Sequence, residues 1–136
     1  MKLRMSYSRA RLLVLALFSG VFAGCGSGYE KYVPAEDKAR KALEAALNAW
    51  CEGKKPGLIE GAPVPTQAVD SRWLAGQKLR SFEIGSEEPN EGPRVFSVHL
   101  TLELPAGRQE TVRYFIVGND PLWVYREDDY KAPAGM

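Results

Sequence analysis

The 136-residue chain contains few of the residues from which small secreted domains and metal sites are built. It has two cysteines, Cys25 and Cys51, and a single histidine, His99. Two cysteines are too few for the disulfide framework of a stapled domain, and one histidine gives no metal-ligand spacing. The sequence therefore predicts neither a disulfide-rich fold nor a metal site, and we expect no cofactor.

The chain also lacks the motifs of the common enzyme classes. It has no phosphate-cradling glycine loop, no Ser/His/Asp motif and no pair of carboxylates at a recognisable catalytic spacing. Its formal net charge is only +1, and the basic residues are interspersed with acids. A nucleic-acid-binding surface needs a concentrated basic patch, so we expect no nucleic-acid partner. The sequence gives no positive sign of catalytic activity.

Long apolar runs are absent except near the N-terminus. Met1–Arg11 carries four basic residues and no acid, and Leu12–Ala23 is almost wholly apolar. As a helix, this run would cover roughly 18 Å at about 1.5 Å per residue, against a bilayer core of about 30 Å. It is too short to span a membrane stably, but its length is typical of the apolar part of a secretory signal.

The residues after this run resemble the lipobox signal of bacterial lipoproteins. Ala23 and Gly24 are small residues immediately before Cys25, and Gly26-Ser27-Gly28 follows as a short tether. Phe22 departs from the pattern, because leucine is commoner at that position. The resemblance implies cleavage after residue 24, a diacylglycerol on the Cys25 thiol and a further acyl chain, such as palmitate, on its amine. The alternative is a plain signal peptide with Cys25 as an ordinary thiol.

A lipidated Cys25 implies a location and a change in charge. The protein would be held at the membrane of a bacterial cell envelope, and Gly26 rather than aspartate favours the periplasmic face of the outer membrane in a host with two membranes. Cleavage would remove four of the 18 basic side chains and none of the 17 acidic ones, which leaves 14 against 17 and a formal charge of −3. Cys51 would then have no disulfide partner within the chain.

After this leader, the sequence predicts one helix and several strands. The apolar positions Ala39, Leu43, Ala46, Leu47 and Trp50 recur at helical spacing, so we expect a helix over Ala35–Cys51. Pro34 suits its first turn. A loop rich in glycine and proline follows over Lys54–Pro65. We expect a lipoprotein signal peptide at 1–24, a flexible tether at 25–33, a single domain at 34–131 and a disordered tail at 132–136.

The second half of the chain alternates apolar and polar residues. Phe96–Leu104 is the clearest strand, and further strands are expected over Leu79–Ile84, Val112–Ile116 and Leu122–Arg126. Short polar turns separate them, which favours an antiparallel meander. Thr66–Asp70 is a further short strand candidate. The fold class expected is α+β, with one long N-terminal helix packed on a curved antiparallel sheet of three to four strands.

This element order resembles the cystatin-like and NTF2-like α+β rolls over roughly Pro34–Tyr130. The resemblance rests on the order of elements and on no specific motif. Cystatin inhibitors use a loop of the Gln-Val-Val-Ala-Gly type, which this sequence lacks. Protease inhibition is therefore not expected.

Two functional hypotheses follow from the candidate site residues. In the first, the domain is non-enzymatic and binds an envelope protein or a small ligand. Trp123 and Tyr125 alternate with Leu122 and Val124, so one pair faces the helix and the other faces outward. Outward aromatic side chains would mark an interface.

In the second hypothesis the domain is a small NTF2-like enzyme or ligand carrier. Asp70 and His99 would handle protons in a cavity between helix and sheet, with Arg113 or Tyr114 opposite. The competing interpretation leaves His99 in solvent and uses Trp50 and Trp73 to plug the core. The acids Glu127-Asp128-Asp129 are expected to form a solvated, extended terminus rather than a cation site.

Overall fold

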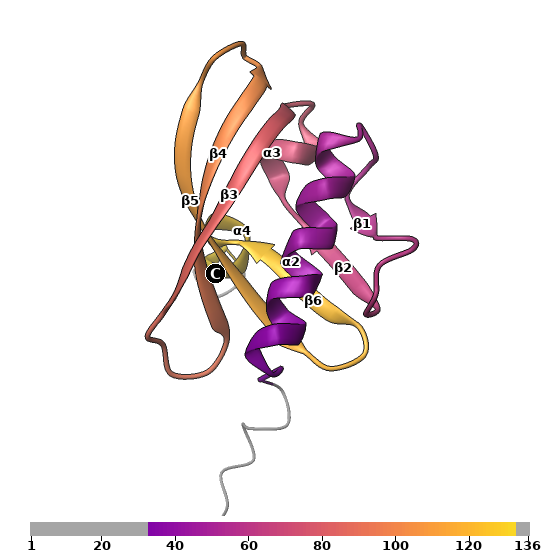
Figure 1. Cartoon of the computed structure of the whole chain (residues 1–136), viewed down its shortest axis with the longest axis vertical. Coiled ribbons are helices and arrows are strands. Elements are labelled where there is room, and N and C mark those ends of the chain that lie inside the picture. The colour runs from indigo at the N-terminus through magenta and orange to yellow at the C-terminus, as the bar shows by residue number, and fades with distance from the viewer. Residues whose placement is uncertain (1–32, 133–136) are drawn as a thin grey trace, which may run out of the picture.

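The computed structural model describes residues 33–132 (Figure 1). The predictions for Cys25, the leader and most of the tether and tail concern residues outside this range. The described elements are α2 (Glu36–Cys51), β1 (Gly57–Leu58), β2 (Thr66–Val69), α3 (Ser71–Leu74), β3 (Lys78–Glu88), β4 (Arg94–Leu104), β5 (Gln109–Gly118), β6 (Leu122–Arg126) and α4 (Glu127–Lys131). None of the helices in residues 33–132 is long and apolar enough to cross a membrane.

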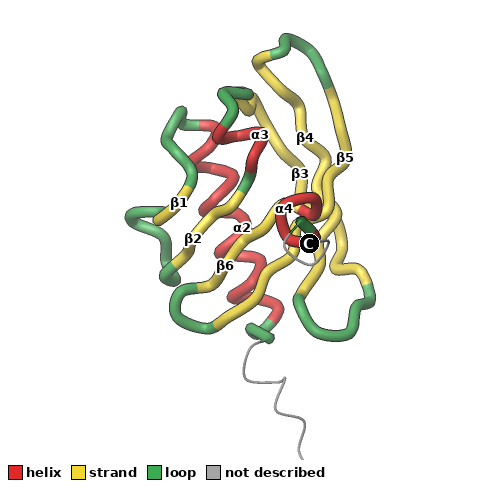
Figure 2. Tube along the Cα trace, turned by 180° about the vertical axis from the view of Figure 1, so that it is seen from behind, coloured by secondary structure: helices red, strands yellow, loops and turns green. Residues whose placement is uncertain are grey.

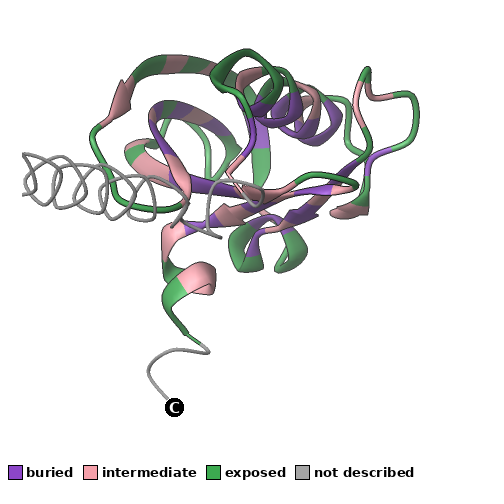
Figure 3. Ribbon diagram, turned by 90° about the horizontal axis from the view of Figure 1, so that it is seen from below, coloured by how far each residue is buried: buried purple, intermediate pink, exposed green. Residues whose placement is uncertain are grey.

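Helix α2 forms where the helical spacing of apolar residues predicts it. Glu36 and Asp37 lie in its first turn, where carboxylates interact favourably with the positive end of the helix. One face is buried, through Ala39, Ala42, Leu43, Ala46, Leu47, Ala49 and Trp50 (Figure 3). Four of these seven residues are alanines, which lets the helix backbone lie close to the sheet.

The sheet has six strands in the order β1-β2-β6-β5-β4-β3. Strands β3 to β6 form an antiparallel meander, and β6 then pairs with β2 in parallel through Thr66–Val69 and Leu122–Tyr125. The sheet curls around α2, which lies along its inner face (Figure 1). The short helix α4 lies on the outer face, in front of the strands in the view of Figure 2.

The hydrophobic core lies between α2 and the inner face of the sheet. In β4 the inward residues Phe96, Val98, Leu100 and Leu102 are fully buried. They alternate with Ser97, His99 and Thr101, which lie on the outer face. The alternation of apolar and polar residues that predicts this strand therefore also distinguishes its buried face from its outer face.

The α+β class is confirmed, but the predicted sheet is wrong in size and direction. It has six strands rather than three to four, it is mixed rather than antiparallel, and the described residues contain two short helices besides α2. The strand β1 has only two residues and lies in the breaker-rich loop, so it leaves no alternating pattern. The parallel pair joins segments more than fifty residues apart, and local periodicity contains no information about such pairing.

Gly118 gives a test of this packing. Its φ is +92°, and a Cβ there would lie 2.8 Å from the backbone oxygen of Pro121. Gly92 has a similar φ of +100°, but a Cβ there would have no neighbour within 4 Å. Both alanine variants should therefore share the conformational strain, and only Gly118→Ala should add a backbone collision. We expect Gly118→Ala to lower the free energy of unfolding by at least about 1 kcal/mol more than Gly92→Ala in urea titrations. Equal losses would contradict the turn geometry.

Candidate functional site

The first sequence candidate, Asp70, lies at the junction of β2 and α3. Its Oδ1 accepts the backbone N–H groups of Arg72 at 3.0 Å and Trp73 at 3.2 Å. These are two of the N–H groups that a helix N-terminus leaves without a partner, and aspartate is a preferred residue for satisfying them. Asp70 therefore caps α3, and the residue is only 4% exposed.

The same carboxylate binds side chains from two distant strands. Oδ2 accepts the Tyr114 hydroxyl at 2.6 Å, and Arg126 Nη1 lies 3.4 Å from both carboxylate oxygens. The other Arg126 nitrogen, Nη2, donates to Glu110 Oε1 at 2.9 Å. Burial raises the pKa of Tyr114 well above its usual value and the Asp70 carboxylate adds to the effect, so this hydroxyl stays protonated and donates.

These contacts leave Asp70 little capacity for catalysis. A carboxylate has about four lone-pair sites, and its oxygens here already accept from two backbone N–H groups, one hydroxyl and one guanidinium. The structure therefore gives Asp70 the role of a buried connection between α3, β5 and β6.

His99 lies on the other face of the sheet. Its ring nitrogens are within 3.4 Å of Thr111 Oγ1 and 3.2 Å of Gln109 Oε1, at an exposed position. Phe96 pairs with Tyr114 and His99 pairs with Thr111 in an unbroken register. Residues three apart in a strand point to opposite faces, so His99 faces away from the side that holds Tyr114 and Asp70.

Arg113 also lies on the outer face and does not join Asp70. Its guanidinium forms ion pairs with Glu88 at 3.0 Å and Glu127 at 2.8 Å. The four residues of the enzyme hypothesis are thus divided between the faces, with Asp70 and Tyr114 inside and His99 and Arg113 outside.

Two tryptophans close the end of the core where α2 stops. Trp50 and Trp73 are 2% and 6% exposed, and their rings stack with centroids 5.6 Å apart. Each indole N–H donates at 2.7 Å to a backbone oxygen, Trp50 to Gln77 and Trp73 to Lys54. The prediction that these two residues plug the core is confirmed.

The candidates Trp123 and Tyr125 lie on the outer face, because they alternate with Leu122, Val124 and Arg126, which are buried. Their rings stack at 5.9 Å. Tyr130 of α4 meets Tyr125 edge to face at 5.7 Å and stacks on Phe115 at 4.7 Å. We call Phe115, Trp123, Tyr125 and Tyr130 the outer aromatic cluster.

The acidic segment that was expected to be extended and solvated is instead helical, so that prediction is wrong. Glu127, Asp128 and Asp129 form the first turn of α4. Glu127 pairs with Arg113 and with Lys131, and Asp129 accepts the backbone N–H of Ser71 at 2.8 Å. Within residues 33–132, no group of three His, Cys, Asp or Glu side chains could hold a metal ion.

Cys51 is half-buried at the end of α2. Its thiol lies 3.7 Å from the backbone oxygen of Arg80. Burial raises the pKa of this thiol, and the neighbouring Glu52 carboxylate raises it further. Both effects disfavour the thiolate, which is the nucleophilic form.

The sequence reasoning missed Phe115, Tyr130 and Arg126 as members of these clusters. Phe115 alternates with the inward Tyr114 and Ile116, so its outward position was available from the pattern. Arg126 continues the inward alternation of Leu122 and Val124, and a charge at an inward position signals a buried partner. The role of Tyr130 had no such signal, because it depends on α4.

Comparison with protein-family models, with curated proteins and with solved structures gives no match. Hypotheses about function therefore depend on the described geometry and on the N-terminal sequence.

Substitutions of Asp70 and His99, the two proton-handling candidates of the enzyme hypothesis, should differ sharply in their effect on stability. Asp70→Ala leaves Arg126 buried beside Glu110 alone and removes the cap of α3, so we expect a loss of about 3–5 kcal/mol in the free energy of unfolding. His99→Ala removes an exposed side chain and should change it by less than about 0.5 kcal/mol. Urea titrations of both variants measure this difference. A mild effect for Asp70→Ala would show that its buried contacts are dispensable.

Proposed function

We propose that this protein is a lipid-anchored protein of the bacterial envelope whose domain binds a protein partner through the outer aromatic cluster. The observation that carries the binding role is the position of Trp123 and Tyr125, which stack on the outer face and remain partly exposed. We further propose that the domain is an NTF2-like or cystatin-like roll. A long helix followed by a sheet that curls around it supports this finer assignment.

The anchor rests on the lipobox-like sequence that ends at Cys25. Each buried methylene of an acyl chain contributes about 0.8 kcal/mol, so two or three chains would hold the protein at the membrane durably. Eight residues, Gly26 to Val33, lie between Cys25 and Pro34. At about 3.3–3.6 Å per residue, the domain would stay within roughly 30 Å of the bilayer surface. A partner would then lie in the same envelope layer.

The chemistry of the outer aromatic cluster favours a protein as its partner. Tryptophan and tyrosine are enriched at the centres of protein interfaces, where their rings give a large contact area. The ion pairs of Arg113 with Glu88 and Glu127 lie beside the rings, and the Arg113 guanidinium is 5.6 Å from the Phe115 centroid. Aromatic rings at the centre with charged side chains around them are the arrangement found in protein–protein interfaces. The division of Asp70 and His99 between the two faces gives no comparable support to an enzyme or a cavity carrier.

Lipidation at Cys25 is tested directly by substitution. We expect the full-length chain to incorporate a clickable palmitate analogue and to partition into the membrane fraction. Cys25→Ala should lose the label, and it should remain as uncleaved precursor or appear as soluble protein. Cys51→Ala is the matched control and should be labelled normally. Labelling that persists in Cys25→Ala would contradict the anchor.

The binding surface is tested by cross-linking in intact cells. A photo-reactive amino acid at Tyr125 should give a discrete adduct, which mass spectrometry identifies. The same group at Glu44, which is exposed on α2, should give none. Trp123→Ala should reduce the Tyr125 adduct by about tenfold, the effect of a moderate interface residue of about 1.4 kcal/mol. Equal adducts from positions 125 and 44 would count against the outer aromatic cluster as the binding surface.

A further inference from the structure

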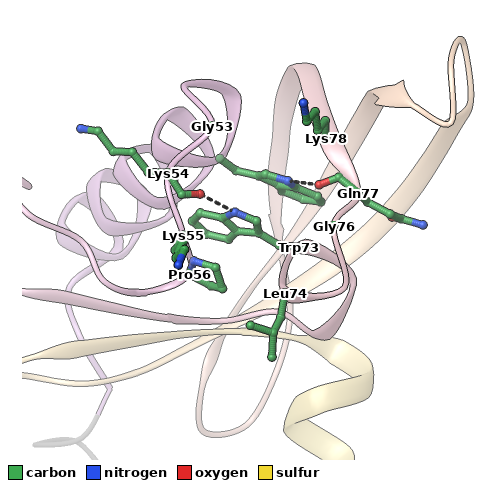
Figure 4. A pocket seen from close by; sticks show the side chains of 10 residues that line it. Gly53, Lys54, Lys55, Pro56, Trp73, Leu74, Gly76, Gln77 and Lys78 are labelled. Carbon is green, nitrogen blue, oxygen red and sulfur yellow. Dashed lines mark hydrogen bonds between the residues drawn. The ribbon is translucent and has the colours of Figure 1, made fainter.

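A pocket of about 420 Å³ opens where α2 ends (Figure 4). It is lined by residues from the end of α2, the following loop, α3 and the start of β3: Trp50, Gly53, Lys54, Lys55, Pro56, Trp73, Leu74, Gly76, Gln77 and Lys78. Its volume falls within the range of roughly 300–1,000 Å³ that small-molecule sites occupy. None of these residues belongs to the outer aromatic cluster, and Trp73 and Leu74 bond to Asp70 through their backbone N–H groups.

One part of the pocket lining is apolar. Trp50, Trp73 and Pro56 line this part, and the two indole rings are stacked on each other. Leu74 lies at its border and is 75% exposed, the most exposed of the large apolar residues in the described part of the chain. An apolar ligand group in the pocket would contact the indoles and cover part of Leu74.

The charged side chains of the pocket are all basic. Lysines 54, 55 and 78 contribute to the lining, and no acidic residue does. Lys54 extends away from the indoles and pairs with Glu52 at 3.0 Å (Figure 4). Lys55 and Lys78 take part in no ion pair within residues 33–132. Figure 4 shows Lys55 beside Pro56 and Lys78 apart from it, at the start of β3. Together they give the pocket a positive field, which attracts an anion.

The residues that line the pocket are also held in place before any ligand binds. Trp73 donates to the Lys54 carbonyl and Trp50 donates to the Gln77 carbonyl, each at 2.7 Å. These two bonds fix the segments that carry Lys55 and Lys78 to the stacked indoles. Since both indole N–H groups are satisfied, the rings offer apolar contact only. A preformed site avoids part of the ordering cost of binding.

We propose that this pocket binds a small amphipathic anion, a carboxylate with a short alkyl or aryl body. The body lies against the indoles and the border at Leu74, and the carboxylate lies in the positive field of Lys55 and Lys78. This binding site is separate from the outer aromatic cluster, and it does not depend on the lipid anchor.

Three probes with the same eight-carbon chain test the charge preference: octanoate, octanol and octyltrimethylammonium. In a Trp123→Phe background the remaining tryptophans, Trp50 and Trp73, both line the pocket, so their emission reports binding there. We expect octanoate to saturate with a Kd at least tenfold below that of octanol. Octyltrimethylammonium should not saturate. The difference should shrink at 1 M salt, where charges are screened within about 3 Å.

Variants separate the two parts of the site. The double variant Lys55→Glu/Lys78→Glu should lower the affinity for octanoate at least tenfold and leave the affinity for octanol unchanged. The matched control, Lys38→Glu/Lys41→Glu, makes the same change in net charge on the exposed face of α2 and should bind octanoate normally. Leu74→Ser should weaken the binding of both octanoate and octanol. Because Leu74 is exposed, this substitution should not impair folding.

Several results would overturn the proposal. Equal affinity for octanoate and octanol would show that the pocket binds apolar chains without regard to charge. Equal losses of octanoate affinity in the two double variants would show that the net charge of the protein, and not Lys55 and Lys78, attracts the anion. Binding to vesicles of anionic lipid without binding to free octanoate would assign the lysines to a membrane surface instead. If Leu74→Ser does not change the affinity for either ligand, Leu74 is not part of the binding site.

Discussion

The structure depends on the buried Asp70 carboxylate, which joins segments that are far apart in the chain. It caps α3, accepts the Tyr114 hydroxyl from β5 and lies against the Arg126 guanidinium at the end of β6. Burial of the pair is close to complete, with Arg126 and Asp70 side chains 6% and 3% exposed. A charge in such surroundings is tolerated only when it is paired and hydrogen-bonded, so alternative registers of β6 that leave Arg126 or Asp70 alone are strongly disfavoured. The four-residue parallel pairing of β2 with β6 offers few backbone bonds of its own, and this side-chain connection makes its position unique.

Both candidate binding surfaces depend on that carboxylate, although neither contains it. On one side, the bond from the Trp73 N–H to Asp70 fixes the start of α3 and hence the indole that stacks on Trp50. On the other side, Arg126 is the N-cap residue of α4, the helix that carries Tyr130 against Phe115 and Tyr125. A loss of the Asp70 contacts would therefore disturb both surfaces at once. For this reason, loss of activity in an Asp70 variant could not by itself identify Asp70 as a catalytic residue.

The sequence predicts those parts of the fold whose periodicity is local. Helix α2 has apolar residues at helical spacing over four turns, and β4 alternates from Phe96 to Leu104, so the predicted bounds of both lie within a residue or two of the observed ones. The pairing of β2 with β6 and the helical form of Glu127–Lys131 depend on contacts with distant residues, and no local pattern encodes them. The same limit applies to the site. Alternation shows that Trp123 and Tyr125 share a face but not which face it is, and an aspartate before Ser71 fits a helix cap as well as a catalytic carboxylate. Arg126 resolves the second ambiguity, because its inward position requires a buried acid as its partner.

The positions of the two surfaces bear on how an anchored protein could use them. Helix α2 is 16 residues long, and at about 1.5 Å per residue it separates the Pro34 end of the domain from the lysine-bearing pocket by roughly 24 Å. An anchor attached before Pro34 would therefore hold the membrane-proximal end of the domain at the start of α2 and leave the pocket at the distal end. The outer aromatic cluster lies on the sheet face opposite α2. A protein bound to the cluster and a small anion in the pocket would occupy different faces, so one need not displace the other. Two contacts connect α3, which carries Trp73, with α4, which carries Tyr130: the Asp70 carboxylate, which binds Arg126, and the hydrogen bond from the Ser71 N–H to Asp129.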